Sequence, residues 1–320
     1  MDKIRIGILG CSGIAKKSMI SNFISSGNFE VVVHASRTLI KAKEFSNEFG
    51  GEYLEGYQNL IDRDDIDCVY ISLPTGMHYE WVMKSLEANK HVFVEKSITT
   101  SFEKTQHLIK EAKIRKLCVF ENFMFIYNEQ YYFVKENIKK GVIGNIKLFK
   151  SSFGFPVFNA NNNIRYKKSL GGGALLDAGA YVLRGAQFLL GFDQKVKSSI
   201  LHYNNEYDVD FHGYISLENS EKVVSQLSFG FNNYYQNNIE IWGVKGKITI
   251  ERAYTSPEGF KHKVVIEKDN KQEEYFISSE NQGIRIIKKF ADCINNDFDY
   301  QYNEILNHSR LLSDVIRKSN

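Results

Sequence analysis

The chain has 320 residues, which is enough for two domains that each bury a core of their own. Hydrophobic residues make up 43% of the chain and charged residues 25%, as in an ordinary globular protein. The 41 basic and 38 acidic residues are well mixed and give a formal net charge of +3, so neither nucleic acid nor a membrane surface is an expected partner.

The first residues, MDKIRIGILG, do not form a signal peptide, and no later segment approaches the roughly 20 apolar residues of a membrane span. The four cysteines, Cys11, Cys68, Cys118 and Cys293, are scattered and form no CxxC pair. We therefore expect a cytoplasmic protein without a disulfide framework and without a metal site.

Strands and helices alternate up to Asn122. Apolar, β-branched runs predict strands at 4–9, 29–35, 67–73, 91–95 and 117–121. Helical patterns lie between them at 14–25, 38–49, 78–88 and 101–115, and Thr100 and Glu103 have the spacing of a capping box for the last helix. Near-continuous apolar strands that alternate with helices predict a parallel sheet with helices on both faces.

The pattern changes after a boundary near 122–124. We expect a helix at 128–140, a strand at 145–155, a loop at 158–163 and a long apolar helix at 171–191. Further strands are predicted at 195–203, 210–218, 222–231, 237–244, 246–251, 262–268 and 273–278, and two final helices at 281–295 and 303–318. Several of these strands alternate polar and apolar residues, which is typical of an antiparallel sheet with one solvated face.

The first predicted strand leads into the sequence GCSGIA at 10–15. A glycine-rich turn between a first strand and a helix binds pyrophosphate through the free N–H groups of the helix N-terminus. Gly10 fits the first glycine of the dinucleotide-binding fingerprint and Ala15 the third, while Ser12 stands at the second. The motif is weak by itself, and a structural tight turn is the alternative. Its position on the first strand of a βαβ series favours nucleotide binding.

The end of the second strand indicates which cofactor binds. Enzymes that use NAD place an acid here for the ribose 2′-hydroxyl, whereas those that use NADP place an arginine near the 2′-phosphate. This chain has Ser36 and Arg37 and no acid at this position. The pattern favours NADP(H), with a solvated loop arginine as the alternative.

Two other segments follow predicted strands, at the sheet edge where ligands bind in parallel sheets. They are PTGMH at 74–78 and VEKS at 94–97. By pattern alone, Lys96 could equally be a solvated lysine, and His78 could simply cap a helix.

Four stretches of the chain together resemble the Gfo/Idh/MocA oxidoreductases, namely GCSGIA, PTGMH, VEKS and, at 171–181, GGGALLDAGAY. The resemblance implies an α/β protein with an N-terminal Rossmann dinucleotide-binding domain at 1–122. It also implies a substrate-binding and oligomerisation domain at 123–320, an α/β domain with a large, mostly antiparallel sheet. The Glu-Lys pair of the family matches Glu95 and Lys96, and the acid of its glycine-rich helix matches Asp177.

Within this family, the stretches ENFMF (121–125), FGFP (153–156) and IRY (164–166) are similar to the NDP-hexose 3-ketoreductases. Tyr181 agrees with this subgroup, because many other members carry histidine there. The similarity implies NADPH-dependent reduction of a keto group, at C3, of a nucleotide-linked deoxysugar. It also implies a homodimer or homotetramer formed through the C-terminal sheet, which has more strands than its few helices can cover.

The resemblance further implies two sets of site residues. The cofactor would contact Gly10, Cys11, Ser12, Gly13, Ile14, Ser36, Arg37, Leu73, Pro74, Thr75, His78, Glu95, Lys96 and Asn122. The substrate would contact Phe155, Arg165, Tyr166, Asp177 and Tyr181.

The chain departs from the family pattern at two positions. Ser97 follows Lys96 where the family usually has proline, often after a cis bond, and Ser12 places a side chain beside the expected pyrophosphate. Because a cis bond before a residue other than proline is rare and costly, we expect a trans bond between Lys96 and Ser97.

The apolar helix at 171–191 carries an acid and a phenol four residues apart. Asp177 and Tyr181 therefore share one face, and Arg184 follows three residues later. A buried carboxylate without partners is destabilising, so the pair is either a satisfied polar contact of the core or part of a site. As a site, we expect Tyr181 as general acid, Lys96 as the group that stabilises charge on the substrate oxygen, and Asp177 as an anchor for a substrate hydroxyl. The roles of Lys96 and Tyr181 could be exchanged.

Two other functions remain open from the sequence. One is a dehydrogenase of free sugars, polyols or dihydrodiols, and the other is a sensor that binds NADP without turnover. The joint presence of Lys96, Asp177 and Tyr181 argues against the sensor.

Overall fold

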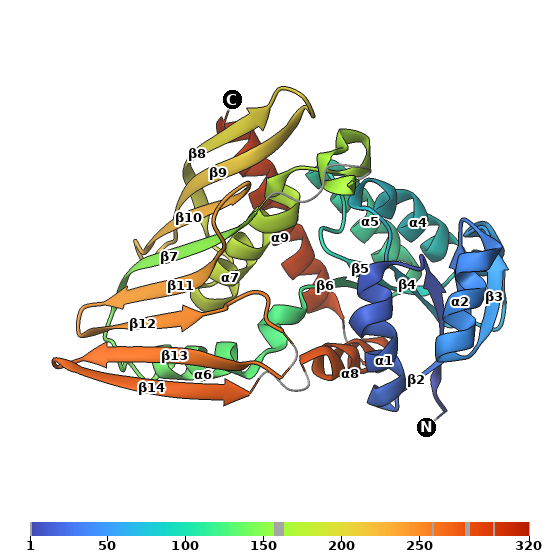
Figure 1. The fold of residues 1–320 in the computed structure, drawn as a ribbon, viewed down its shortest axis with the longest axis horizontal. Helices are drawn as coiled ribbons and strands as arrows, with labels where there is room; N and C mark the ends of the chain where they lie inside the picture. The colour runs from blue at the N-terminus through green and yellow to red at the C-terminus, as the bar shows by residue number, and fades with distance from the viewer. Residues whose placement is uncertain (1, 157–162, 258, 279–281, 297, 320) are drawn as a thin grey trace. The chain divides into compact units, whose positions relative to one another are not determined.

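The computed structural model describes residues 2–156, 163–257, 259–278, 282–296 and 298–319. Its contacts divide the chain into two compact units (Figure 1). The first contains Met1–Asn122 with Gly283–Leu306, and the second contains Phe123–Gln282 with Asn307–Asn320. The sequence division placed everything after 122 in one domain, whereas in the structure residues 283–306 group with the first unit. The loop expected at 158–163 lies, apart from Asn163, outside the described residues.

The first unit is built on a parallel sheet. Its strands are β1 (Ile4–Leu9), β2 (Phe29–Ser36), β3 (Glu52–Glu55), β4 (Cys68–Ile71), β5 (His91–Glu95) and β6 (Val119–Asn122). Across the sheet these six described strands run in the order β3-β2-β1-β4-β5-β6, all parallel. The strand order reverses between β1 and β4, which is where such sheets bind ligands beyond the carboxyl ends of their strands. The sequence pattern missed β3 because this short edge strand is exposed at three of its four residues.

Helices cover both faces of this sheet. They are α1 (Ile20–Ser26), α2 (Leu39–Phe49), α3 (Gln58–Ile61), α4 (Thr75–Glu87), α5 (Phe102–Arg115), α8 (Gln282–Asn295) and the first part of α9 (Asp299–Ser319). One face packs aliphatic residues against α4 and α5. The other holds aromatic rings at centroid distances of 5.1–5.8 Å, namely Phe23, Phe29, Tyr70, Phe93, Phe120 and Phe290.

The capping box expected at Thr100 and Glu103 is wrong by one residue. Ser101 is extended and caps α5, because its hydroxyl accepts a hydrogen bond from the Lys104 amide at 3.4 Å. A threonine and a serine stand side by side here, so spacing alone could not choose between them.

Two helices begin with a turn of π-helix, and both follow a glycine-rich segment. The turn Ala15–Met19 (η1) precedes α1, and Leu175–Gly179 (η5) precedes α7 (Ala180–Leu190). The sequence predicted one helix over 171–191, but residues 171–173 form a turn instead. Local π turns of this kind are frequent at functional sites.

The second unit is built on a mixed sheet. Its strands are β7 (Ile146–Phe155), β8 (Lys195–Asn204), β9 (Val209–Glu218), β10 (Val224–Phe231), β11 (Gln236–Gly243), β12 (Gly246–Glu251), β13 (Lys261–Lys268) and β14 (Lys271–Ser278). These eight described strands run in the order β14-β13-β12-β11-β7-β10-β9-β8. Only β7 and β10 pair in parallel among them, so the predicted, mostly antiparallel sheet is present.

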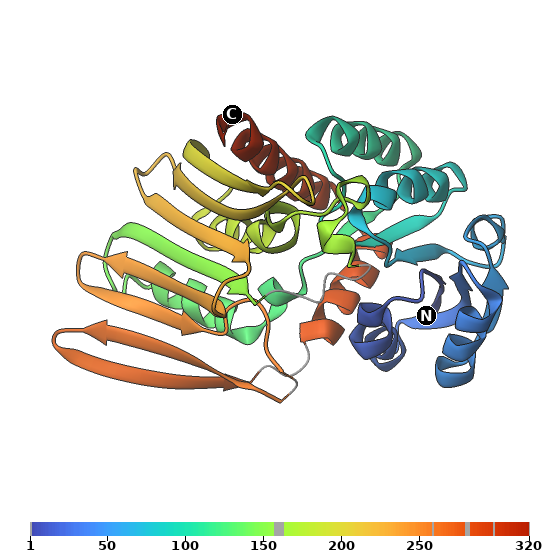
Figure 2. The ribbon, with the colours of Figure 1, turned by 45° about the horizontal axis from the view of Figure 1, so that its top comes forward.

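One face of this sheet carries the helices of the unit (Figure 2). They are η2 (Met124–Tyr127), α6 (Glu129–Lys139), η3 (Ile164–Tyr166), η4 (Lys168–Leu170), η5 with α7, and the last part of α9. The core lies between them and the inward residues of the strands, which alternate with outward polar residues. Within the described ranges, no helix has both the length and the apolarity needed to cross a membrane.

Candidate active site

The glycine-rich turn after β1 is a close approach of backbone segments. Gly10 has a φ of +104°, and a Cβ there would lie 2.9 Å from the Leu73 side chain. The Ser72 hydroxyl donates a hydrogen bond to the Gly10 carbonyl at 2.5 Å. The Ser12 hydroxyl accepts one from the Ala15 amide at 3.2 Å, so Ser12 caps the helix start. This position therefore tolerates serine in place of the second glycine.

The end of β2 presents Arg37 to solvent and buries Ser36. The positive charge of Arg37 lies near the hydroxyl of Tyr57, a residue that no motif indicated. An acid lies nearby at the end of β3, where Glu55 accepts the Leu39 amide at the start of α2, at 3.3 Å. Cys11 lies beneath the turn, where burial raises the pKa of its thiol to about 11. The Cys11 side chain therefore packs in the core, where its Sγ lies 3.8 Å from the Ala35 carbonyl oxygen.

His78 is fully buried in α4 and joins two segments. Its Nε2 lies 2.7 Å from the Leu73 carbonyl oxygen, and its Nδ1 lies 2.8 Å from the Ser97 carbonyl oxygen. Burial lowers the pKa of this imidazole. His78 thus links the segment after β4 to the segment after β5, and it does not cap the helix, whose N-cap is Pro74.

Glu95 is the last residue of β5 and Lys96 follows it, and both are partly buried. Glu95 Oε1 accepts hydrogen bonds from the Tyr70 hydroxyl at 2.6 Å and from Asn122 Nδ2 at 2.8 Å. Burial raises the pKa of this carboxyl group, although both hydrogen bonds oppose the shift. The Glu-Lys pair is thereby joined to the end of β6.

The Lys96–Ser97 peptide bond is cis, so the expected trans bond is wrong. The rarity of such cis bonds is a property of the dipeptide alone and takes no account of the contacts around it. In the folded unit, the Ser97 carbonyl meets His78, and the Ile98 amide donates a hydrogen bond to Glu121 Oε1 at 2.7 Å. Glu121 was part of the ENFMF stretch, but its contact with this segment could not be foreseen.

In the second unit, Asp177 is paired with Arg165. Arg165 Nε lies 2.6 Å from Asp177 Oδ2, and the two side chains are 35% and 22% exposed. The turn η3 presents Arg165, and the Asp177 amide donates to the Gly173 carbonyl at 3.3 Å. The acid of the apolar helix therefore has a charged partner at a half-open position.

Tyr181 lies one turn further along, in a group of aromatic rings. Its ring centroid lies 5.2 Å from that of Phe153, 5.4 Å from Phe125 and 5.8 Å from Tyr254. Unlike the buried Tyr254, Tyr181 is only partly buried. Arg184 is buried, and its guanidinium carbon lies 5.1 Å from the centre of the Phe192 ring.

Phe155 and Tyr166 belong to a second aromatic group of this unit. Tyr166 stacks on Tyr207 at 5.0 Å and on Phe211 at 5.4 Å, and Phe155 lies 5.5 Å from Phe231. Tyr207 and Phe211 come from the β8–β9 region and carried no motif, so sequence reasoning missed them. The structure thus places Phe155, Arg165, Tyr166, Asp177 and Tyr181 in one unit, and Lys96 in the other.

Two family models match the chain. The model for the "Oxidoreductase family, NAD-binding Rossmann fold" matches residues 4–123, and the model for the "GFO/IDH/MocA C-terminal domain" matches residues 131–249. A curated 3-reductase from Actinomadura kijaniata is 37% identical over 91% of this chain and 87% of its own length. The chain belongs to the Gfo/Idh/MocA oxidoreductase family.

The relatives within this family agree with one another. The Actinomadura kijaniata protein is named dTDP-3,4-didehydro-2,6-dideoxy-α-D-glucose 3-reductase, and a protein of the same name from Saccharopolyspora spinosa is 38% identical over 90% of this chain and 86% of its own length. The crystal structure of the 3-ketoreductase KijD10 from Actinomadura kijaniata, in complex with NADP and TDP-benzene, superposes with a TM-score of 0.95. It is 34% identical and covers 99% of this chain and 98% of its own.

Family membership confirms the fold class and the enzyme class predicted from the sequence. The chain is an oxidoreductase with a Rossmann-type parallel sheet and a second, mostly antiparallel sheet. In the part of the chain that the structure describes, no three His, Cys, Asp or Glu side chains are grouped as metal ligands, and Cys11, Cys68, Cys118 and Cys293 are all free thiols.

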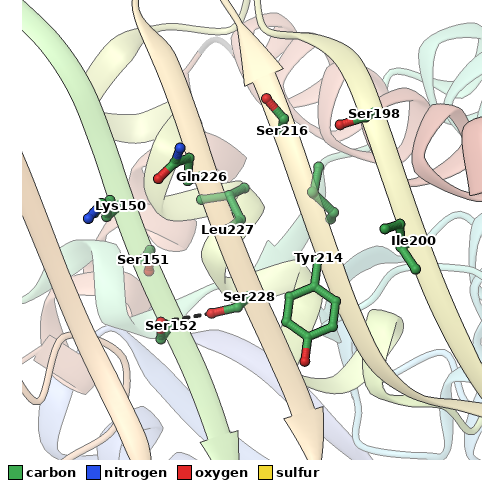
Figure 3. Close-up of a pocket in the computed structure, with 11 residues that line it drawn as sticks. Lys150, Ser151, Ser152, Ser198, Ile200, Tyr214, Ser216, Gln226, Leu227 and Ser228 are labelled. Carbon is green, nitrogen blue, oxygen red and sulfur yellow. Dashed lines mark hydrogen bonds between the residues drawn. The ribbon is translucent and has the colours of Figure 1, made fainter.

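A hollow of about 360 Å³ lies on the sheet of the second unit, on the face that bears no helix (Figure 3). Its lining comes from β7, β8, β9 and β10 and consists of Lys150, Ser151, Ser152, Ser198, Ile200, Tyr214, Ile215, Ser216, Gln226, Leu227 and Ser228. Ser152 and Ser228 hydrogen-bond across it at 2.8 Å. The hollow is shallow and rich in small side chains, and Asp177 and Tyr181 do not line it.

Proposed function

We propose that this protein is an NADP(H)-dependent reductase of the C3 keto group of a nucleotide-linked deoxysugar. The observation that carries the proposal is the match, over both units, to a 3-ketoreductase determined with NADP and TDP-benzene. Two further structures of KijD10 contain variants in which a lysine was changed to alanine or a tyrosine to phenylalanine, the two residue types of our catalytic assignment.

The residues of the first unit fit a bound dinucleotide. The Gly10 turn leaves no room for a Cβ and offers the amides of a helix start to phosphate. Ser36 and Arg37 suit the 2′-phosphate of NADP(H), and Leu73 and Pro74 form the turn after β4 that leads into Thr75, the first residue of α4. Within the described residues, Asn122 Oδ1 is buried and lacks a hydrogen-bond partner, so it can accept a hydrogen bond from a ligand. Gly13 has open space around it, which suits contact with the cofactor but does not require glycine.

When bound, NADPH supplies the hydride. The side chains of the protein must stabilise the negative charge on the substrate oxygen and supply a proton to it. The reduced carbonyl oxygen gains negative charge, which Lys96 stabilises, and it then needs a proton, which Tyr181 donates. Asp177 anchors a substrate hydroxyl, and Arg165 holds its carboxylate through Oδ2. Hydrogen bonds made by Glu95 and His78 hold the segment that carries Lys96 in place.

We assign recognition of the nucleotide part to Phe155, Arg165 and Tyr166. The rings of Phe155 and Tyr166 belong to one aromatic group, and planar aromatic faces suit a nucleobase. The Arg165 guanidinium suits phosphate and hydroxyl oxygens. The free cysteines agree with a reducing compartment, so we place the enzyme in the cytoplasm.

We also propose that the enzyme is a homodimer or homotetramer that associates through the helix-free face of the second sheet. Ile200 and Tyr214 project from this face and are 55% and 53% exposed. Small serines beside them let another sheet approach closely. Light scattering at micromolar concentration should show an oligomer, and Tyr214→Glu should shift it toward monomer. A monomeric wild type would contradict this assignment.

The test of the function is NADPH oxidation, followed by absorbance, with a dTDP-linked 3-keto deoxysugar as substrate. The matched control is the same sugar without its nucleotide. We expect turnover only with the linked sugar and faster turnover with NADPH than with NADH. Equal turnover of the free sugar would point instead to a sugar dehydrogenase.

A further inference from the structure

The helix that carries Asp177 and Tyr181 begins without a cap of its own. Its N-cap residue, Ala174, has helical dihedral angles and no side-chain hydrogen bond of its own to the helix start. The Leu175 amide instead donates a hydrogen bond to the carboxylate of Asp210 on β9 at 2.6 Å, and the Ala174 amide lies close enough to stabilise the charge of the same carboxylate. A carboxylate 35 residues further along the chain thus takes the place of a local cap.

Two of the three glycines before this helix, Gly172 and Gly173, lie where a side chain would not fit. Gly173 has a φ of +113°, and a Cβ there would overlap the Asp210 carboxylate. A Cβ on Gly172 would overlap the backbone of Arg165, whose carbonyl accepts the Gly173 amide at 2.9 Å. The turn therefore places the start of the helix against β9 on one side and against the Arg165 turn on the other.

We propose that Asp210 is a positioning residue, whose carboxylate on β9 fixes the first turn of the helix that presents Asp177 and Tyr181. The inference rests on the proposed function, which gives these two side chains their roles. Asp210 acts through the backbone of the helix and does not touch the substrate. Because Asp177 lies in the turn that follows the capped amides, a shift of this turn moves its carboxylate relative to Arg165.

The surroundings of Asp210 define what a change of pH does. Burial raises the pKa of its carboxyl group to about 6, and the hydrogen bond from the Leu175 amide, with the nearby amides of Asp210 and Ala174, opposes the shift. Tyr203 on the paired strand β8 interacts electrostatically with Asp210, and the ion pair of Lys168 with Asp208 lies near Tyr203. As the pH falls through about 6, the cap loses the negative charge that favours a helix N-terminus.

Stability and turnover should then move in opposite directions. The folded-state pKa of Asp210 lies above the value of about 3.9 for an unfolded aspartate, so folding favours the protonated form. The contribution of this group to stability therefore falls as the pH rises through about 6, while the charged cap that we assign to catalysis forms in the same range. A residue that served stability alone would not produce this opposition.

The experiment compares Asp210→Ala, Asp210→Asn and a matched control, Asp193→Ala, in the full-length enzyme. Asp193 also caps a backbone amide of the same unit, that of Ser220 at 2.8 Å, but it lies beyond the C-terminal end of α7, opposite the end that Asp210 caps. Hydrogen exchange of the peptides covering 171–181 measures the cap directly. We expect roughly tenfold faster exchange in Asp210→Ala, as for the loss of an N-cap, and no change there in Asp193→Ala.

Steady-state kinetics test the consequence for catalysis. Asp210→Ala should lower kcat more than it raises KM, with NADPH binding unchanged. Asp210→Asn keeps an acceptor oxygen, so it should restore much of the exchange protection and lack the fall in kcat between pH 7 and 5. If Asp210→Ala does not fold, the exchange and the pH profile of Asp210→Asn decide the question.

Unchanged exchange over 171–181 in Asp210→Ala, or the same acid limb in Asp210→Asn as in wild type, would overturn the role of Asp210. A wild-type enzyme that does not turn over the nucleotide-linked keto sugar would instead overturn the proposed function. The exchange measurement needs no substrate, so it still decides whether Asp210 holds the helix.

Discussion

The two units build their functional residues in different ways. In the first, the candidate residues follow the ends of parallel strands, and backbone geometry gathers them: Gly10 after β1, His78 after β4 and Lys96 after β5. In the second, they sit on a helix start and a short turn, held by Asp210 and by aromatic rings from distant strands. The first arrangement follows a rule of the fold, whereas the second depends on individual long-range contacts.

This difference teaches where substitutions should be tolerated. A strand-end site is supported by the whole sheet, so a single side chain can be removed there while the backbone cradle for the cofactor persists. In the second unit, the positions of Asp177 and Tyr181 depend on a few side chains, so removal of one of these supports should spread to its neighbours.

Removal of Lys96 should produce the largest loss. Lys96→Ala should lower turnover by about 10²–10³-fold or more, because a charge-stabilising donor is lost at the reacting oxygen. NADPH binding, measured by fluorescence, should persist, because the Gly10 turn and Arg37 are untouched. The control is Lys110→Ala, an exposed lysine of α5. A Lys96→Ala enzyme with near wild-type turnover would remove Lys96 from the chemistry.

Removal of the Tyr181 hydroxyl should lower turnover somewhat less than removal of Lys96. Tyr181→Phe should lower turnover by roughly 10²-fold, the low end for general acid catalysis, since lysine or water can replace the phenol as proton donor. Substrate KM should change little. Tyr254→Phe is the matched control from the same aromatic group: its hydroxyl meets Ser151 at 2.5 Å, so its loss should lower stability by about 1 kcal/mol and leave turnover near wild type. The reverse outcome would exchange the roles of the two tyrosines.

Arg37 should affect cofactor choice and little else. Arg37→Ala should weaken NADPH binding by roughly 10–100-fold, as expected for a charge-assisted hydrogen bond, and leave NADH binding nearly unchanged. Fluorescence titration with both cofactors gives the two affinities. Equal affinities of the wild type for NADPH and NADH would show that the end of β2 does not discriminate.

The smallest effect concerns Glu95 and the pH dependence of stability. Burial raises its pKa in the folded state, so the stability gained from the protonated form is full below the unfolded value of about 4.3 and is lost as the pH rises through the folded-state pKa. Glu95→Gln keeps an acceptor for Tyr70 and Asn122 but cannot titrate, so it should flatten this decline. Denaturant unfolding at several pH values measures it. An unchanged slope would place the titrating group elsewhere.

The sequence predicted the first unit better than the second for a physical reason. Apolar strands, the Gly10 turn and residues such as Lys96 are local signals, and the parallel sheet brings strand ends together by rule. The sequence pattern did not predict β3, because this strand is exposed. It also did not predict the cis bond before Ser97, because His78 and Glu121 contact that segment from other parts of the chain.

In the second unit, periodicity predicted the sheet and the apolar helix, and spacing placed Asp177 and Tyr181 on one face. Neither periodicity nor spacing could predict which side chains contact this helix. Arg165 lies 12 residues before Asp177, and Asp210 lies 35 residues after Leu175, and neither separation follows from a repeat or a motif. The return of α8 to the first unit was hidden for the same reason, since an amphipathic helix does not specify which core it covers.

The most direct test of the account is single-turnover oxidation of bound NADPH by a dTDP-linked 3-keto deoxysugar in wild type, Lys96→Ala and Tyr181→Phe. We predict a rapid phase in the wild type, a much slower one in Tyr181→Phe, and almost none in Lys96→Ala although NADPH is bound. Rapid phases of similar rate in all three proteins would contradict the assignment and return Asp177 and Tyr181 to a satisfied polar pair of a core helix.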